Sequence, residues 1–149
     1  MLRCDAENVK PDMVILGKAL SGGVYPVSAV LANNEVMLVL DPGSHGSTFG
    51  GNPVAAKVSV AALDVLIEEK LAERSQVIGE IFRNRLKKVV PSNVIVRGAG
   101  LMNAIEIPPT FSKRLGKNAE AYDVCLHLLR EHGILCKPTH NDIIRLTPP

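Results

Sequence analysis

Aromatic side chains and excess charge are scarce in this sequence. The 149 residues include no tryptophan, two tyrosines and three phenylalanines, and the formal net charge is only +2. Proteins that bind nucleic acids need a strong positive field or aromatic platforms on which bases can stack. The composition therefore excludes nucleic acid as an expected partner.

Long apolar runs are also missing. A helix that spans a bilayer needs about 20 consecutive apolar residues, and charged, glycine or proline residues interrupt every candidate here. Arg3 and Asp5 stand where a secretory signal would need apolar residues. We therefore expect a protein that is not secreted and that has no membrane partner.

Cysteine is sparse and has no metal-binding pattern. Cys4, Cys125 and Cys136 are odd in number and lie far apart in the sequence, with no C-x-x-C pair and no cluster of histidines beside them. Neither a disulfide framework nor a zinc site is predicted from this spacing. We expect free thiols in a reducing compartment, with Cys125 on the core face of a helix.

The first third of the chain is typical of an α/β protein. Residues 13–16 form an apolar run, which predicts a strand buried on both faces of a parallel sheet, and residues 27–31 have the same character. Two segments rich in glycine and small residues, 17–23 and 41–52, predict loops that a ligand can approach closely.

A helical region and a smaller α+β unit follow. Asn52 and Pro53 predict a helix start, and an apolar stripe continues to Pro91, as one long helix or two in tandem whose first half is buried on most sides. After it we expect four short strands and one helix that ends at Gly133. The predicted strands cover residues 94–96, 101–107, 134–137 and 143–146.

These elements predict three parts: 1–52 as the end of a larger α/β domain, 53–91 as a connecting helical region and 92–149 as a small α+β domain. Strands stand close to both ends of the sequence, without helices to cover them. Because a parallel sheet needs helices on both faces, we expect an interior piece of a larger protein.

Lys18 is the most informative residue for chemistry. It directly follows the first predicted strand and lies among glycine, alanine and serine, which cannot form a core. Three interpretations are open: a solvated lysine, a phosphate-binding lysine or a Schiff-base lysine. The Walker pattern of phosphate-binding loops is absent, and a Schiff base needs a neutral amine, with a pKa below the usual value of about 10.4.

Ser47, Thr48 and Arg145 are the other candidates. Ser47 and Thr48 lie in the second glycine-rich segment just before a predicted helix, where hydroxyl and N–H groups suit a phosphate, although a plain turn would have the same residues. Arg145 lies in an apolar strand, which predicts either an internal salt bridge or capture of a substrate carboxylate.

The longest motifs resemble a known family. ILGKALSGG (15–23), YPVSA (25–29) and HGSTFGGNP (45–53) resemble the class-III pyridoxal-phosphate aminotransferases. KPTH (137–140) and IIRLTPP (143–149) resemble the branch of that family that acts on ornithine. The resemblance covers essentially the whole sequence, in order.

The resemblance implies a fold type I transferase, present as part of the large cofactor domain and most of the small domain. It implies that Lys18 holds pyridoxal 5'-phosphate as an internal aldimine and moves a proton, and that Thr48, with Ser47 beside it, binds the cofactor phosphate of a partner subunit. It implies that Arg145 binds the α-carboxylate of the 2-oxo acid. The reaction would be transfer of the δ-amino group of L-ornithine to 2-oxoglutarate in a dimer or larger homo-oligomer.

Alternatives to this function remain open at this point. Acetylornithine aminotransferases share the lysine motif, and a non-catalytic piece that binds or dimerises would carry the same residues. The family that the motifs resemble occurs in the mitochondrial matrix and in the cytosol, so both compartments are expected. A chain of this length, without the rest of the family's large domain, is expected to be inactive alone.

Overall fold

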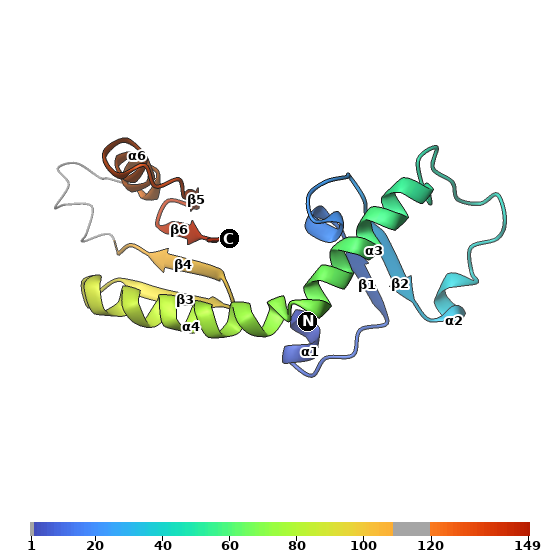
Figure 1. Ribbon diagram of the computed structural model, residues 1–149, viewed down its shortest axis with the longest axis horizontal. Coiled ribbons are helices and arrows are strands. Elements are labelled where there is room, and N and C mark those ends of the chain that lie inside the picture. Colours follow the sequence, from blue (N-terminus) through green and yellow to red (C-terminus); the bar gives the residue numbers. More distant parts are fainter. Residues whose placement is uncertain (1, 109–119) are drawn as a thin grey trace. The chain divides into compact units, whose positions relative to one another are not determined.

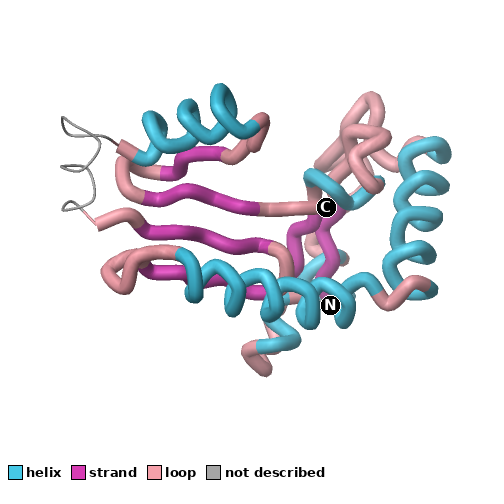
Figure 2. Tube along the Cα trace, turned by 60° about the vertical axis from the view of Figure 1, so that its left-hand side comes forward, coloured by secondary structure: helices cyan, strands magenta, loops and turns pink. Residues whose placement is uncertain are grey.

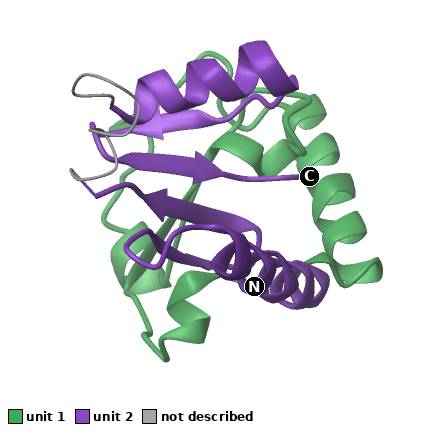
Figure 3. Ribbon diagram, turned by 90° about the vertical axis from the view of Figure 1, so that its left-hand side faces the viewer, with its two compact units in different colours: residues 1–71 green, residues 72–149 purple. Residues whose placement is uncertain are grey.

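The computed structural model describes residues 2–108 and 120–149, in two compact units, Met1–Leu71 and Ala72–Pro149 (Figure 3). The boundary falls at the start of the second of two helices, α3 (Pro53–Glu68) and α4 (Leu71–Val89), so of the two predicted alternatives the tandem arrangement is the one observed. The helical hydrogen bonds of α3 continue to the N–H of Glu69, which donates to the carbonyl of Val65. The next residue, Lys70, is left-handed with φ of 50°, and the helix stops there. A left-handed residue ends a helix.

The predicted division of the sequence into three parts, with boundaries after residues 52 and 91, stays a prediction. Part of its third segment, residues 109–119, lies outside the described residues. In the described chain, no helix is both long and apolar enough to cross a membrane.

Unit 1 contains an antiparallel pair of strands, β1 (Met13–Leu16) and β2 (Ala29–Ala32), which lie side by side in Figure 1 with Leu16 opposite Ala29. The other elements of this unit are α1 (Arg3–Ala6), the 3-10 helix η1 (Lys18–Ser21), α2 (Asn34–Met37) and α3. The prediction of a doubly buried parallel strand at 13–16 is wrong, since Ile15 is 75% exposed. The connection between the strands contains only one short turn of helix, whereas parallel neighbours need a long crossover.

Helix α3 begins as predicted. The side chain of Asn52 accepts a hydrogen bond from the N–H of Ala55 at 2.8 Å, and Pro53 is the first helical residue. Its first half is not buried on most sides: Ala55 and Ser59 are buried, whereas Val54 and Val60 are more than half exposed. Small residues on one face let η1 pack closely against the helix.

Unit 2 is a four-stranded antiparallel sheet with the order β3-β4-β6-β5, in which β3 (Ile95–Ala99) and β4 (Met102–Glu106) form a hairpin (Figure 2). Helix α6 (Ala121–His132) packs against β5 (Lys137–Thr139) and β6 (Ile143–Leu146). The strand predicted at 143–146 is confirmed. The strand predicted at 134–137 begins only at residue 137, because Gly133 is left-handed and the chain first has to turn back from the helix.

The core of unit 2 lies between α6 and the sheet. Ile107, Ala121, Cys125 and Ile144 are its buried members. The prediction that Cys125 lies on the core face of its helix is confirmed, as is the left-handed glycine that ends the helix, with φ of 66°. All three cysteines are free thiols, as expected.

A close backbone contact fixes α4 to the turn of the β3–β4 hairpin. Gly79 lies so near this turn that a Cβ atom on it would be 1.8 Å from the carbonyl oxygen of Gly100. One turn further along the helix, Arg83 donates hydrogen bonds to that carbonyl at 2.7 Å and to the side-chain oxygen of Asn103 at 2.8 Å. Asn103 is buried, so this contact positions the start of β4.

The contact predicts the effect of one added methyl group. In Gly79→Ala the helix must move away from a backbone oxygen, which cannot rotate aside. Overpacking of this kind costs about 1–3 kcal/mol, and we expect unit 2 to lose about 2 kcal/mol of unfolding free energy, measured by urea unfolding. Gln76→Ala, at an exposed position of the same helix, is the matched control and should change stability little. An unchanged midpoint in Gly79→Ala would show that the contact is looser than described.

Candidate functional site

Lys18 occupies an unusual backbone position at the end of β1. Gly17 is extended, and Lys18 itself is left-handed with φ of 52°. Such a conformation costs about 1–2 kcal/mol for a residue with a Cβ, and non-glycine residues of this kind concentrate at functional sites. The Lys18 side chain is exposed, and within the described residues no hydrogen bond or ion pair holds it. The turn therefore presents an unpaired primary amine.

The Lys18 turn is anchored by a buried hydroxyl. Ser21, at 1% exposure, accepts a hydrogen bond from the N–H of Tyr25 at 3.0 Å and donates one to the carbonyl of the same residue. Next to it, Gly22 faces α3, where a Cβ atom would meet the side chain of Ala62 at 3.5 Å. These contacts hold the turn against α3 and leave Lys18 at its outer edge.

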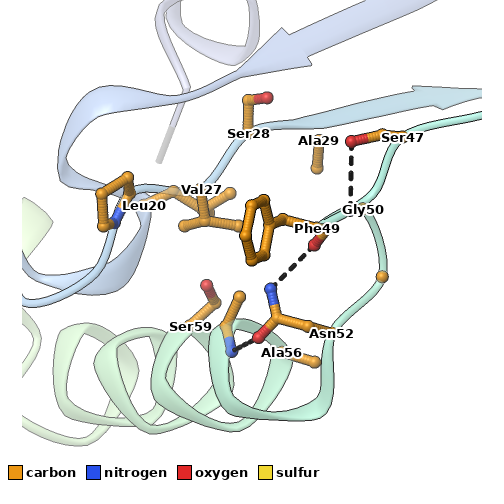
Figure 4. Close-up of a pocket in the computed structure, with 13 residues that line it drawn as sticks. Leu20, Val27, Ser28, Ala29, Ser47, Phe49, Gly50, Asn52, Ala56 and Ser59 are labelled. Atoms are coloured by element: carbon orange, nitrogen blue, oxygen red, sulfur yellow. Dashed lines mark hydrogen bonds between the residues drawn. The ribbon is translucent and has the colours of Figure 1, made fainter.

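Asn52 ties the second glycine-rich segment to α3 (Figure 4). Its amide nitrogen donates to the carbonyl of Phe49 at 2.8 Å, while its oxygen caps the helix. Ser47 accepts a hydrogen bond from the N–H of Gly50 at 3.1 Å, so its own hydroxyl proton remains available to a ligand. Thr48 is exposed beside it. The loop thus presents two hydroxyl groups just before the N-terminus of a helix.

A cavity of about 620 Å³ lies between this loop, the segment before β2 and α3. Ser59 is 9% exposed, and its hydroxyl has no hydrogen-bond partner in the described part of the chain. Ser47 lines the cavity, but Lys18 and Thr48 do not, so the structure does not bring these candidates into one pocket. The residues that line it are Leu20, Pro26, Val27, Ser28, Ala29, Ser47, Phe49, Gly50, Gly51, Asn52, Ala55, Ala56 and Ser59.

Arg145 lines a second cavity, of about 690 Å³, in unit 2. The predicted salt bridge is not observed, because Arg145 is exposed and no acidic side chain pairs with it among the residues described. Lys137 lies directly opposite Arg145 across β5 and β6 and lines the same cavity. Like charges placed opposite one another destabilise a sheet, and an anion bound between them would relieve that repulsion.

Sequence reasoning missed Lys137 as a neighbour of Arg145. The pairing register of β5 and β6 is what makes it a neighbour of Arg145, and the strand was predicted too early in the chain to show that register. The signal available in the sequence was only that the two cations lie in consecutive predicted strands, 134–137 and 143–146.

The sequence profile of one family, Aminotransferase class-III, matches residues 1–149. The chain belongs to the class-III aminotransferase family. The family match covers both units, and therefore both the Lys18 turn and the strand that carries Arg145.

Individual class-III aminotransferases are highly similar to the chain. The mitochondrial ornithine aminotransferase of Arabidopsis thaliana is 58% identical over 153 aligned positions, which cover 100% of this chain and 31% of the relative. The crystal structure of ornithine aminotransferase from Toxoplasma gondii is 46% identical with a TM-score of 0.86, over 99% of this chain and 34% of that one. The crystal structure of acetylornithine aminotransferase from Elizabethkingia anophelis is 53% identical with a TM-score of 0.84, over 99% and 38%. The chain thus spans about a third of the length of these proteins.

The two hydrogen bonds of Asn52 can be separated by substitution. Asn52→Ala removes both the helix cap and the bond to the Phe49 carbonyl, and loss of a cap costs about 1 kcal/mol. Asn52→Asp keeps the capping oxygen and removes only the donor, so the start of α3 should stay protected while the loop loosens. Hydrogen exchange of the first amides of α3 and of residues 47–50 measures the two effects. Equal protection of α3 in both variants would contradict the assigned cap, and Asn84→Ala, at an exposed site in α4, serves as the control.

Proposed function

We propose that this chain is a segment of a pyridoxal-phosphate-dependent ornithine aminotransferase, in which Lys18 carries the cofactor. The observation that supports it most strongly is the unpaired Lys18 amine, held in a left-handed turn by Ser21 and α3. The similarity of the whole chain to the Arabidopsis thaliana ornithine aminotransferase favours L-ornithine and 2-oxoglutarate as substrates.

The residues present fit pyridoxal phosphate by their chemistry. The aldehyde needs a primary amine that is free to condense, and the Lys18 amine has no partner in the described chain. The phosphate needs hydrogen-bond donors, and the loop before α3 offers the hydroxyl groups of Ser47 and Thr48 at the N-terminus of that helix. When bound, the cofactor would supply an electron sink for the bond that is broken.

The family resemblance implies how the site is assembled. By that resemblance, Thr48 would bind the phosphate of a cofactor held by a second copy, and Lys18 would hold the cofactor of its own copy. The structure is compatible with this, since the two residues do not line one cavity within this chain. This arrangement makes a homo-oligomer, a dimer or larger, part of the proposal.

Lys18 and Arg145 would have separate roles in the reaction. The Nζ atom of Lys18 would take the proton from the δ-carbon of ornithine, which bears the amino group, and in the second half of the cycle would give a proton to the α-carbon of the 2-oxo acid. Arg145 would bind the α-carboxylate of the 2-oxo acid through two parallel hydrogen bonds. Lys137, opposite it, would add positive potential without the same fixed geometry.

Acetylornithine aminotransferase activity is a second candidate, because the Elizabethkingia anophelis protein is 53% identical to this chain. The two substrates differ by an acetyl group on the α-amino nitrogen. We expect the complete gene product to prefer L-ornithine, and the ratio of kcat/KM for L-ornithine to that for N-acetyl-L-ornithine decides between them. Absence of turnover with either would favour a non-catalytic binding role.

The compartment proposed is the mitochondrial matrix, with the cytosol as the alternative. The support is the Arabidopsis thaliana relative, which is a mitochondrial protein. Fluorescence microscopy of the complete gene product with a C-terminal tag tests this assignment.

Removal of the Lys18 amine should stop turnover. In the complete gene product, Lys18→Ala is expected to lower kcat by about 10²- to 10⁴-fold, which is the usual contribution of a general acid–base group. Added methylamine should restore part of the rate, since a small amine can occupy the space of the missing side chain. Lys57→Ala, at an exposed position of α3, is the control. A Lys18→Ala enzyme with near-normal turnover would rule out the proposed role.

Arg145 and Lys137 should differ in how much they contribute to binding of the 2-oxo acid. A hydrogen bond to a charged group contributes about 1.5–3 kcal/mol, so Arg145→Met should raise the KM for 2-oxoglutarate by about 10- to 100-fold. Lys137→Met should raise it only a few-fold, because an exposed point charge is screened by solvent. Steady-state kinetics of the complete gene product measures both. An equal KM in Arg145→Met and wild type would contradict carboxylate binding at this residue.

A further inference from the structure

Two of the three cysteines meet at the same hydrophobic cluster of unit 2. Cys125 lies on the face of α6 that is buried against the sheet, and the chain turns back at Gly133 to bring Cys136 against the same core cluster. The Cys136 side chain thus packs against the cluster to which Cys125 belongs. Cys4, in the other unit, has no cysteine near it in the sequence and is the only cysteine outside this pair.

The two thiols differ in their access to solvent. Cys125 is 6% exposed, whereas Cys136 is partly exposed and lines the cavity that also contains Arg145 and Lys137. A small solute that enters this cavity can therefore reach Cys136 without any unfolding. It cannot reach Cys125 in the same way.

Burial also makes Cys125 a weak acid. Burial, and then the neighbouring Cys136 thiol, raise the pKa of Cys125 to about 12. Because the thiolate is the reactive form, Cys125 is a poor first nucleophile. Cys136, which lines the cavity, is the thiol that a dissolved oxidant meets first.

We propose that Cys125 and Cys136 form a redox-active dithiol site, which peroxide converts into a disulfide within one chain, with Cys136 as the attacking thiol. In the first step the Cys136 sulfur attacks a peroxide oxygen: an S–O bond forms, the O–O bond breaks, and one water leaves. The Cys136 sulfur loses two electrons, which reduce the peroxide.

In the second step the Cys125 sulfur attacks the sulfur of Cys136. An S–S bond forms, the S–O bond breaks, and the hydroxyl group leaves as a second water with the proton of Cys125. Two thiols and one hydrogen peroxide thus yield one disulfide and two waters. An external thiol reverses the change by thiol–disulfide exchange.

The site goes beyond the proposed transaminase function and does not depend on it. It is connected to that function only by position, because Cys136 directly precedes Lys137, which faces Arg145. Oxidation would therefore attach the wall of the Arg145 cavity covalently to α6.

Peroxide treatment followed by peptide mapping tests the proposal on the full chain. The folded protein is treated with hydrogen peroxide, free thiols are alkylated, and trypsin is added. Trypsin cleaves after Arg130, between the two cysteines, so their peptides stay together only if the sulfurs are bonded. We expect a cross-linked pair with the mass of two hydrogens lost, sensitive to dithiothreitol, and an alkylated Cys4.

Variants assign the order of reaction. In Cys125→Ala, peroxide should leave a sulfenic acid on Cys136 that dimedone labels; in Cys136→Ala, Cys125 should stay reduced. Cys4→Ala should form the cross-link as the wild type does, and circular dichroism checks that each variant is folded. The proposal is overturned if wild-type Cys136 is oxidised to a sulfinic acid without a cross-link. A cross-link to Cys4, a cross-link between chains, or the same yield in concentrated guanidinium chloride would also overturn it.

Discussion

The hydroxyl of Ser21 supports the arrangement of the whole candidate site in unit 1. It is buried and bonded to both backbone groups of Tyr25, which closes the turn that carries Lys18. That turn packs on α3, and α3 is capped by Asn52, whose amide holds the loop of Ser47. The strained backbone of Lys18 persists because these contacts surround it.

In unit 2, contacts to the backbone of one turn hold α4 against the sheet. Gly79 allows α4 to approach the β3–β4 hairpin, and Arg83 bonds to the carbonyl of Gly100 in its turn and to the side chain of Asn103 in β4. In the same sheet, the pairing of β5 with β6 places Arg145 opposite Lys137, and both residues line one cavity. A cavity with two cations and no acidic partner in the described chain is suited to an anion, which supports the proposal of a carboxylate site in unit 2.

Short sequence motifs correctly predicted where two helices begin or end. Asn52 with Pro53 gave the start of α3 and Gly133 the end of α6, because capping is decided by a few adjacent residues. The same reasoning failed for residues 13–16, since apolar content does not report strand direction or which face is covered. Lys137 beside Arg145 and Cys125 beside Cys136 depend on register and tertiary packing, which periodicity does not contain. The roles of Lys18, Thr48 and Arg145 came from the family resemblance.

The central claim is that the amine of Lys18 carries the cofactor, and covalent trapping tests it most directly. The complete gene product, loaded with pyridoxal phosphate, is reduced with borohydride, digested and mapped by mass spectrometry. The account predicts a stable pyridoxyl label on Lys18 in nearly every copy. A label on Lys10 or Lys57 instead, or an unlabelled Lys18 in a protein that retains the cofactor, would contradict it.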